Sequence, residues 1–374
     1  MSSIIIKEVK TKRDLNKFID FANDLYKGND CYVPTLRGDI KDMFNREKNG
    51  AYEYCDSVGV LAYKDKKVVG RLMGIINYRY NDKMNVKHLR FTLYDVIDDF
   101  EVTKAMFDYI IKWGKGQGMT EINGPLGFTD IDKQDMLIEG YDKIGMSITN
   151  YNYPYYNEHM EKLGLVKDVD HVEYLIHVPE KLDSRVERVQ NALLNRFNFK
   201  LLKFTDKKKI LPYIYQAFDI YNEAFNRLHG TVLLTERQIK NLVGQFIGLI
   251  DLDYVPIVVD KDDNVVGFAV LAPSLAKALQ KNKGKLLPFG WYPMLKALKK
   301  NDTLEMYMIA IKPEYQGYGL NAILMHDVTK VAIAKGVKYA ETGPELEENY
   351  QVRSQWENYN AELIRKRRCY IGKI

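Results

Sequence analysis

Several patterns that mark specialised chemistry are missing from this sequence of 374 residues. No HExxH, GxSxG or paired Cys/His spacing occurs, and the six histidines stand apart, so no metal centre is expected. The three cysteines, Cys31, Cys55 and Cys369, lie far apart and form no CxxC pair. They do not build a disulfide framework, and this usage is typical of a protein in a reducing cytoplasm.

Long apolar runs are also scarce. The longest, residues 242–259, is interrupted by Asp251 and Asp253, so it is not expected to span a bilayer. At the start of the chain, the apolar residues 4–6 run directly into Lys7, which is too short for the apolar core of a secretory signal. We therefore expect a cytoplasmic protein with no membrane span.

Charge of one sign does not dominate, since the formal net charge is only +5. The lysines are scattered, and only residues 365–368, Arg-Lys-Arg-Arg, form a tight basic run. A nucleic-acid-binding surface needs basic residues gathered on one face, so no nucleic-acid partner is expected. The run at 365–368 is interpreted as a solvated edge segment.

The most informative feature that is present is an internal repeat. Near the start, a strand-like segment leads to Thr11, which with Asp14 suits the cap of a helix, and apolar residues then recur at helical spacing. The same order returns from Leu201 onward, with Thr205 in the capping position. In both halves a charged turn then joins two strand-like segments.

A third match completes the repeat. Gly118 precedes Gly124 by six residues, and Gly336 precedes Gly343 by seven; each first glycine ends a predicted helix and is followed by a strand. The chain also exceeds the usual size of a single core. These observations predict two copies of one mixed α/β unit, residues 1–178 and 197–374, joined by a helical linker at 179–196 that is apolar on one side.

The sharpest local pattern lies in the second copy, where a β-rich strand at 304–311 runs into a glycine loop that opens a helix. Such a loop presents several backbone N–H groups with the positive end of the helix behind them, and so favours a phosphate or pyrophosphate. Gly317 and Gly319 permit close approach of the backbone to a ligand. A Rossmann site is a poorer match because GxGxxG is absent, and a Walker loop is excluded.

Gln316-Gly317-Tyr318-Gly319 after a strand resembles the pyrophosphate loop of the GNAT acyltransferases, whose pattern is Arg/Gln-x-x-Gly-x-Gly/Ala; Asn321 departs from the small residue expected last. The resemblance implies acetyl-CoA or another acyl-CoA as co-substrate, without a metal. It also implies two tandem GNAT-like domains with mostly antiparallel sheets flanked by helices, the first copy being degenerate. The residues that it implies for CoA binding are Ile309, Ile311, Gln316, Gly317, Tyr318, Gly319, Leu320, Asn321, Asn349 and Trp356.

Two residues are candidates for acid–base chemistry. Glu305 lies five residues before Ala310 on the strand that feeds the loop, where the histone-modifying branch of the family places a general base. The alternative is a surface carboxylate with no catalytic role. Many family members place a tyrosine seven residues after the asparagine as general acid, but Trp356 stands there, so Tyr359 is the candidate, with protonation of the thiolate by solvent as the alternative.

The first copy lacks a glycine loop, because no glycine lies between Gly74 and Gly114 and acidic residues precede its helix. We therefore expect it to bind no CoA. Its tail is rich in tyrosine, and an aromatic and polar surface suits a cationic or sugar-like acceptor. Packing of these tyrosines across the domain interface is the alternative. The candidate acceptor-binding residues are Arg71, Tyr151, Asn152 and Tyr155.

Residues 274–302 have no counterpart in the first copy, and they alternate large apolar residues with lysines. Three interpretations stay open: a lid over the acceptor site, a helix at a membrane surface, and packing between the domains.

The function that these features favour is transfer of an acetyl or other acyl group from acyl-CoA to a primary amine of a small molecule or peptide. Two alternatives remain. One is the aminoacyl-tRNA-dependent transferases that are also built from tandem GNAT-like domains, although those lack a usable CoA loop. The other is a non-catalytic CoA-binding protein, which the tryptophan at position 356 favours. The sequence does not identify the acceptor or the oligomeric state.

Overall fold

The computed structural model describes residues 3–182, 184–225, 229–248 and 250–374. The first half contains the following helices and strands: β1 (Ile5–Glu8), α1 (Lys12–Leu25), α2 (Arg37–Phe44), β2 (Cys55–Lys64), β3 (Lys67–Asn77), α3 (Tyr78–Met84), β4 (His88–Val96), α4 (Phe100–Lys115), β5 (Glu121–Gly124), β6 (Met136–Glu139), α5 (Tyr155–Lys162) and β7 (Val166–His177).

The second half repeats this order with additions: α6 (Ser184–Phe197), β8 (Lys200–Leu202), α7 (Lys207–Phe225), α8 (Glu236–Phe246), β9 (Ile257–Val259), β10 (Val265–Pro273), α9 (Ala276–Asn282), α10 (Trp291–Lys299), β11 (Thr303–Ile311), α11 (Leu320–Ala334), β12 (Tyr339–Thr342), β13 (Glu345–Leu346), α12 (Tyr350–Arg353) and β14 (Ala361–Lys373). Short 3₁₀ turns lie at Gly50–Glu53, Leu252–Tyr254, Pro313–Tyr315 and Ser354–Asn358.

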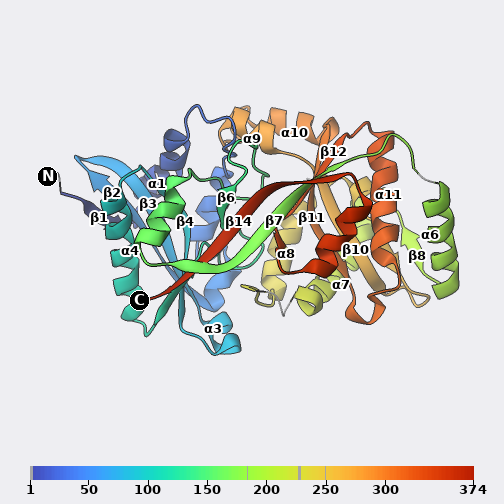
Figure 1. The fold of residues 1–374 in the computed structure, drawn as a ribbon, viewed down its shortest axis with the longest axis horizontal. Coiled ribbons are helices and arrows are strands. Elements are labelled where there is room, and N and C mark those ends of the chain that lie inside the picture. Colours follow the sequence, from blue (N-terminus) through green and yellow to red (C-terminus); the bar gives the residue numbers. More distant parts are fainter. Residues whose placement is uncertain (1–2, 183, 226–228, 249) are drawn as a thin grey trace.

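The strands of both halves join in one continuous sheet, in the order β1-β2-β3-β4-β5-β14-β7-β12-β11-β10-β9-β8. The last long strand of each half lies beside the other half: β7 pairs with β12, and β14 pairs with β5. These two strands also pair with each other, and they cross the centre of the molecule side by side, so that both chain ends lie at the first-half end (Figure 1). The two halves are thus joined by exchanged strands as well as by α6.

In the first half, helices cover both faces of the sheet because the strands are apolar on both sides. Neighbouring residues of β3 show this alternation. Leu72 packs in one cluster with Phe107 of α4, and Met73 packs in another with Phe18 of α1. All four side chains are fully buried.

The second half has the same three layers. Val258 of β9 packs with Leu324 of α11 on one face of the sheet. Its neighbour Ile257 packs with Ile220 of α7 on the other face. The predicted mixed α/β fold with a mostly antiparallel sheet and flanking helices is therefore confirmed, whereas the domain limits at 178 and 197 stay a prediction. Residue 183 of the predicted linker lies outside the described residues.

The helix starts agree in part with the sequence. Thr11 and Asp14 form the expected capping box at α1, with the Asp14 amide donating to Thr11 Oγ1 at 3.1 Å. At α7, however, the amide of Lys208 donates to Asp206 Oδ1 at 2.8 Å, so Asp206 supplies the cap that was predicted for Thr205. Aspartate is as good a cap as threonine, and the shift of one residue follows from where the strand β8 ends.

The interpretation of residues 365–368 as a solvated edge is wrong. β14 lies in the middle of the sheet, and Arg365 and Arg367 are 1% and 0% exposed. Both guanidinium groups donate to the carboxylate of Glu173 on β7. Burial alone would raise the pKa of Glu173, but the two arginines hold it below its ordinary value. The sequence analysis misread this basic run because β14 is exchanged between the halves. The exchange buries charged side chains that would lie at the edge of a sheet if β14 stayed with its own half.

Candidate active site

The glycine loop lies between β11 and α11, as the sequence predicts. Gly317 and Gly319 adopt φ angles of +85° and +78°, a left-handed conformation that favours glycine. Gly319 is the N-cap of α11, and no side chain hydrogen-bonds to the first amides of this helix. Leu320 is buried below the loop, whereas Asn321 is exposed in the first turn. The helix therefore presents uncapped amides beside an exposed glycine loop.

The corresponding helix of the first half is capped. Asp99 is the N-cap of α4, and its carboxylate accepts the amide of Glu101 at 3.1 Å. Asp99 also forms an ion pair with Lys64 at 2.8 Å. A carboxylate already occupies the position that a phosphate would need, and its charge repels anions. The difference between α4 and α11 is the physical basis for expecting a single CoA site.

Helix α6 packs over the glycine loop. A Cβ atom at Gly319 would lie 2.8 Å from Leu193 Cδ1, which is closer than side-chain atoms tolerate. The ring of Tyr318 contacts Phe197 at the end of α6, with 4.7 Å between ring centroids. The φ angle of Gly319 favours glycine, and a side chain at this position would also displace Leu193 of α6, whereas the space around Gly317 is open.

The strand that feeds the loop separates from its neighbour halfway along. β11 pairs in parallel with β12 only from Thr303 to Met306, after which the two strands diverge. Ile309 and Ile311 lie beyond this point and pair on one side with β10. Their other side is not paired with β12 within the described part of the chain. Ile309 is partly exposed, so its backbone is open to a ligand in the way that the sequence predicts.

Glu305 lies just before this divergence and is 1% exposed, so the alternative of a surface carboxylate is wrong. Its carboxylate accepts hydrogen bonds from three residues. Ser274 Oγ donates at 2.6 Å, Ser147 Oγ at 2.5 Å with the Ser147 amide at 3.2 Å, and Tyr307 Oη at 3.2 Å. We call these four residues the Glu305 cluster. It joins β11, the end of β10 and a loop of the first half.

Burial raises the pKa of Glu305, and the hydrogen bonds from Ser147 and Ser274 offset part of that rise. Tyr307 is partly exposed, whereas Glu305 is sealed beneath it. A ligand would therefore be linked to Glu305 through the hydroxyl group of a neighbouring residue rather than by direct contact. The sequence analysis missed the partners: Ser274 was detectable as the residue that ends β10 beside Glu305, but Ser147 is 158 positions away and carries no sequence signal.

Asn349, Trp356 and Tyr359 are assembled near the second-half core. Asn349 caps α12 by accepting the amide of Val352 at 3.3 Å. Trp356 is 3% exposed and donates its indole N–H to Glu345 at 2.9 Å. Burial raises the pKa of Glu345 to about 7. Tyr359 packs edge-on against Trp356, and no contact is recorded between Tyr359 and the Glu305 cluster among the described residues.

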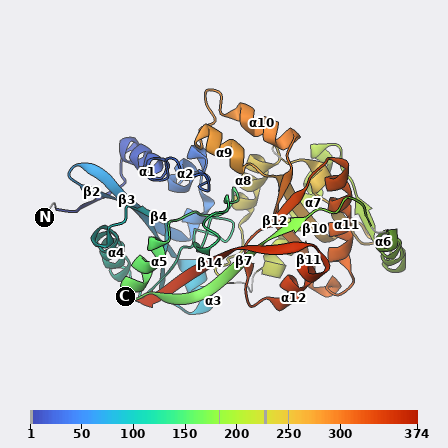
Figure 2. The same ribbon diagram turned by 45° about the horizontal axis from the view of Figure 1, so that its top comes forward.

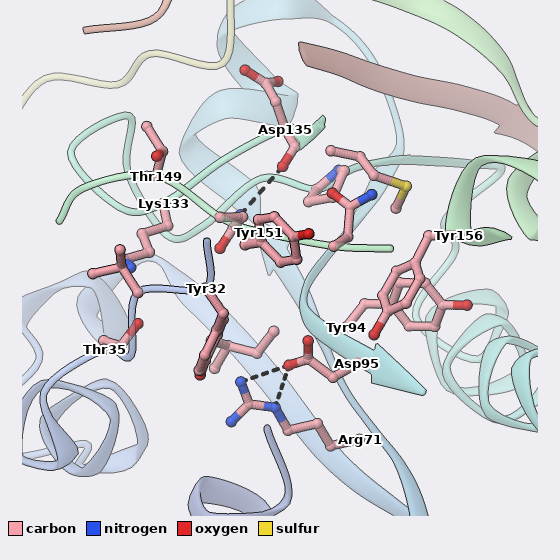
Figure 3. Close-up of a pocket in the computed structure, with 16 residues that line it drawn as sticks. Tyr32, Thr35, Arg71, Tyr94, Asp95, Lys133, Asp135, Thr149, Tyr151 and Tyr156 are labelled. Atoms are coloured by element: carbon pink, nitrogen blue, oxygen red, sulfur yellow. Dashed lines mark hydrogen bonds and ion pairs between the residues drawn. The ribbon is translucent and has the colours of Figure 1, made fainter. Parts of the chain in front are cut away.

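The predicted acceptor-binding residues are only partly brought together. Arg71, Tyr151 and Asn152 line a small recess of the first half with a cavity volume of about 40 Å³, shown in Figure 3. Arg71 forms a buried ion pair with Asp95 at 2.7 Å. Tyr155 does not line the recess; its hydroxyl donates to the carbonyl of Val96 at 2.7 Å.

The recorded ring contacts of the tyrosines in this region join residues of the first half, and packing across the interface between the halves stays a prediction. Tyr151 and Tyr153 contact Tyr26 of α1, with ring centroids 5.6 and 5.1 Å apart. Tyr156 packs against Tyr94 of β4. All of these partners belong to the first half. Tyr156 also shares a core cluster with Tyr370, so this core includes one strand from the second half, β14.

Lys133 connects the recess with the Glu305 cluster. It lines the recess, and Figure 3 shows it on the side opposite to Arg71. Burial lowers the pKa of Lys133 to about 8, although attraction to Glu305 opposes this shift. The recess residues Thr149 and Asn150 also follow closely after Ser147 in the chain. The recess and the Glu305 cluster are therefore neighbours in space.

Comparison with known proteins shows which family and which folds these features resemble. Residues 214–354 match the family model described as Acetyltransferase (GNAT) family. A tandem GNAT protein from the clavulanic acid biosynthesis pathway has a similar fold, with a TM-score of 0.58 at 10% identity over 99% of this chain and 98% of that one. Residues 214–354 are thus similar to the GNAT family in sequence, and the chain as a whole has the fold of a tandem GNAT protein. A GCN5-related N-acetyltransferase from Sphaerobacter thermophilus also shares the fold, with a TM-score of 0.52 at 11% identity over 99% and 95% of the two chains.

Two relatives are similar along the whole tandem arrangement. Protein YghO of Escherichia coli (strain K12) is 24% identical over 377 residues, which covers 99% of this chain and 95% of that protein. A bacterial ceramide synthase of Caulobacter vibrioides (strain NA1000 / CB15N) is 23% identical over 374 residues, covering 97% and 95%. Both similarities include the first half of the chain as well as the half that matches the family model.

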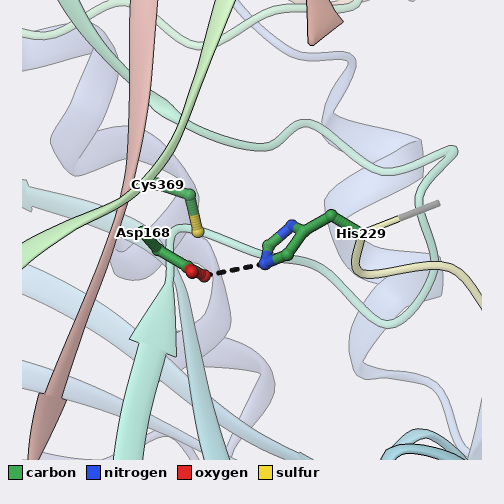
Figure 4. A group of neighbouring side chains, drawn as sticks. All are labelled: Asp168, His229 and Cys369. Atoms are coloured by element: carbon green, nitrogen blue, oxygen red, sulfur yellow. Dashed lines mark hydrogen bonds and ion pairs between the residues drawn. The ribbon is translucent and has the colours of Figure 1, made fainter. Parts of the chain in front are cut away.

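A further group of side chains has the composition of a metal site. Asp168, His229 and Cys369 bring their ligand atoms within 4.8 Å of one another, as Figure 4 shows. His229 Nε2 already lies 2.7 Å from Asp168, and Asn123 Nδ2 donates to Asp168 at 2.6 Å. Burial raises the pKa of the Cys369 thiol well above its ordinary value. These contacts hydrogen-bond the candidate ligand atoms to neighbouring side chains and join β7 and β14 to the loop that carries His229.

Proposed function

We propose that this protein transfers an acyl group from acyl-CoA to a primary amine, with the acyl-CoA bound by the second half. The observation that carries the proposal is the uncapped start of α11. This helix follows strand β11, which separates from its parallel neighbour β12 beside the buried carboxylate of Glu305. The amides of residues 320–322 and the loop at 316–319 would hold the pyrophosphate. The free edge at Ile309 and Ile311 would hydrogen-bond the pantetheine arm.

The proposed reaction is a direct attack. The lone pair of a neutral amine forms a bond with the thioester carbonyl carbon, and the carbon–sulfur bond then breaks to release CoA as a thiolate. The nitrogen loses one proton and the thiolate gains one, so the charges balance. A residue that accepts the first proton and a source of the second are therefore the groups to identify.

The Glu305 cluster is our candidate for the proton acceptor. Because Glu305 is sealed and accepts several hydrogen bonds, we propose that the ammonium proton passes through the hydroxyl of Tyr307 or Ser147 to the carboxylate. The raised pKa of Glu305 supports this role, since a carboxylate with a higher pKa holds a proton more firmly. Ser274 holds the carboxylate in place.

The thiolate has a less defined proton source. Trp356 lacks a proton of suitable acidity and is engaged with Glu345. Tyr359 remains the candidate general acid, but burial raises the pKa of its phenol, which makes proton donation harder. Protonation by solvent is sufficient for a thiolate, because the ordinary pKa of a thiol is about 8.5 and the thiolate is a tolerable leaving group.

We propose a long-chain amino alcohol as the acceptor class and a fatty acyl-CoA as the donor. The relative from Caulobacter vibrioides is named as a bacterial ceramide synthase, and a ceramide is the amide of a fatty acid with a long-chain amino alcohol. The relation covers both halves, including the recess beside Lys133. The cationic Lys133 and Arg71 would repel a second ammonium group but can donate hydrogen bonds to the hydroxyl groups of such an acceptor, so a monoamine fits better than a polyamine.

The experiment measures release of free CoA thiol in a matrix of donors and acceptors. Acetyl-CoA and palmitoyl-CoA are each paired with sphinganine, a short amino alcohol such as ethanolamine, and a polyamine. We expect turnover with sphinganine and palmitoyl-CoA. Turnover only with short acceptors would refute the acceptor class, and acyl-CoA binding by calorimetry without turnover on any amine would favour the non-catalytic CoA-binding alternative.

A further inference from the structure

The connection between α9 and α10, together with α10, carries a concentrated group of exposed apolar side chains. Leu287 and Phe289 are 80% and 77% exposed, which is unusual for residues of this size in a folded chain. Six exposed large hydrophobic residues fall within ten positions: Leu286, Leu287, Phe289, Trp291, Tyr292 and Leu295. Single exposed apolar residues are ordinary, but a contiguous group of this kind marks a binding surface.

The charge of the same segment is entirely positive. Between residues 276 and 300 there is no aspartate or glutamate, and every lysine is exposed. These lysines are Lys277, Lys281, Lys283, Lys285, Lys296, Lys299 and Lys300. No ion pair is recorded for any of them within the described part of the chain. We call residues 276–300 the basic apolar face.

The opposite side of this segment is fixed to the first half. Leu279 and Met294 are buried in one cluster with Val33. The amide of Arg37 donates to the carbonyl of Gly284 at 2.9 Å, and Gln280 Nε2 donates to the carbonyl of Tyr32 at 3.0 Å. The packing interpretation of the insertion therefore holds for this side. The same packing holds α10 away from the sheet at the edge of the molecule, as Figure 2 shows.

We propose that the basic apolar face docks the protein on the surface of an anionic lipid bilayer. Leucine and phenylalanine at the turn would enter the acyl boundary, tryptophan and tyrosine favour the interface, and the lysines attract anionic headgroups. α10 is too short to cross a bilayer, and within the described residues no helix has the length and apolar character needed for a span. The face therefore lies on the bilayer. The uniform positive charge argues for this occupant over a protein partner.

Both ends of the basic apolar face are tied to the Glu305 cluster. Ser274, which donates to Glu305, directly precedes Leu275 and α9. Asn301, which follows α10, donates its side-chain amide to the carbonyl of Ser274 at 2.6 Å. Docking would thus bring the bilayer close to the proposed acceptor site. The supply of a lipid amine from the bilayer rests on the proposed function, but docking itself is measured without acyl-CoA or acceptor.

The test uses co-sedimentation of the full-length protein with vesicles of phosphatidylcholine alone or with added phosphatidylglycerol. We expect strong binding to the anionic vesicles, weak binding to the neutral ones, and loss of binding at high salt. The double variant Leu287→Glu/Phe289→Glu should reduce the partition coefficient by at least about tenfold. A matched control, Met84→Glu/Val166→Glu, adds two carboxylates at other exposed apolar positions and should bind like the wild type.

A second variant separates charge from apolar burial. Lys285→Gln/Lys296→Gln/Lys299→Gln should weaken binding to anionic vesicles by roughly 100-fold, because each lysine near the surface contributes independently. The control Lys12→Gln/Lys112→Gln/Lys261→Gln removes the same charge elsewhere and should bind nearly as the wild type does. Equal losses in both triple variants would overturn the proposal, since net charge alone would then drive binding.

Two other results would also overturn it. The first is wild-type protein that does not sediment with anionic vesicles. The second is a wild-type dimer in light scattering that Leu287→Glu/Phe289→Glu converts to a monomer, with vesicle binding unchanged, because the face would then be an interface between copies. Circular dichroism of each variant shows that it is folded. None of these measurements depends on turnover, so failure here is distinct from failure of the proposed acyl transfer.

Discussion

At the residue scale, Glu305 and Tyr307 carry the most direct prediction. If a proton passes through Tyr307 to Glu305, Glu305→Gln should lower kcat by roughly two to four orders of magnitude and leave CoA affinity nearly unchanged. Tyr307→Phe should cause a smaller loss, because Ser147 offers a parallel hydroxyl. Steady-state thiol release and calorimetry with CoA measure the two quantities.

The pH profile distinguishes a proton acceptor from a structural carboxylate. The wild-type rate should rise with pH as Glu305 loses its proton and, at higher pH, as the substrate amine becomes neutral. Only the rise at lower pH, which belongs to Glu305, should be absent in Glu305→Gln. Ser274→Ala serves as a control that removes a positioning hydrogen bond and leaves the carboxylate in place. A Glu305→Gln variant with an unchanged rate would reduce Glu305 to a link between the halves.

Glu345 gives a stability prediction. Its pKa is about 7 in the folded protein against an ordinary value of 4.5, because burial disfavours the charged form. Above pH 4.5 the folded state thus binds more protons than the unfolded state, so the free energy of unfolding falls as the pH rises and levels off above pH 7. The loss from this group is about 3 kcal/mol.

The variant Glu345→Gln removes this titration. It should be close to the wild type in stability at pH 4.5 and more stable than the wild type at pH 8, as measured by urea unfolding at both values. The glutamine oxygen still accepts the Trp356 indole N–H, which keeps the packing intact. A variant that is less stable than the wild type at pH 8 would contradict the prediction.

At the element scale, the contrast between α4 and α11 can be tested at the first turn of α11. Asn321 is exposed there and follows Gly319 and Leu320. A carboxylate near a helix N-terminus stabilises the helix, but it would repel the pyrophosphate. Asn321→Glu should therefore weaken CoA binding by roughly tenfold or more while the Tm stays the same or rises.

This design avoids the ambiguity of changing Gly319, where the φ angle and Leu193 make any side chain disruptive. Asn321→Gln is the neutral control and should bind CoA nearly as the wild type does. If Asn321→Glu binds CoA normally, the ligand phosphates do not lie at the start of α11, and the assignment of the loop is incorrect.

The short elements also show which local features can be predicted from the sequence. The glycine loop, the hairpins and the cap at Thr11 are local features whose dihedral angles and hydrogen bonds involve residues a few positions apart, and the sequence predicted them. The cap at α7 was displaced by one residue, to Asp206, because two acceptable capping residues stand side by side. Arg71, Tyr151 and Asn152 of the predicted acceptor-binding residues share a recess, whereas Tyr155 lies outside it, because side-chain direction depends on packing.

At the scale of the whole molecule, the exchanged strands predict that neither half is independent. A fragment of residues 197–374 would lack β7, the strand that pairs with β12, and would leave most of β14 without a partner. It would also expose Arg365 and Arg367 without Glu173. We expect this fragment to be unfolded or aggregated when expressed alone, as measured by circular dichroism and light scattering.

A fragment that begins at residue 166 is the matched comparison, because it restores β7. It should retain more helical signal and more cooperative thermal unfolding than residues 197–374. Cooperative unfolding of the shorter fragment with the stability of the full protein would show that β7 is dispensable, and the strand exchange would then not unite the halves.

The sequence by itself determined the repeated mixed α/β unit, the position of the glycine loop and the candidate carboxylate at Glu305, because apolar periodicity, glycine conformations and motif spacing are local. Only the tertiary structure decided that β7 and β14 change places, that Arg365 and Arg367 are buried, and that Ser147 reaches Glu305. These contacts join residues more than 100 positions apart, and no local pattern records them. The free energy of burying and pairing such groups arises only when the two halves close on a shared sheet.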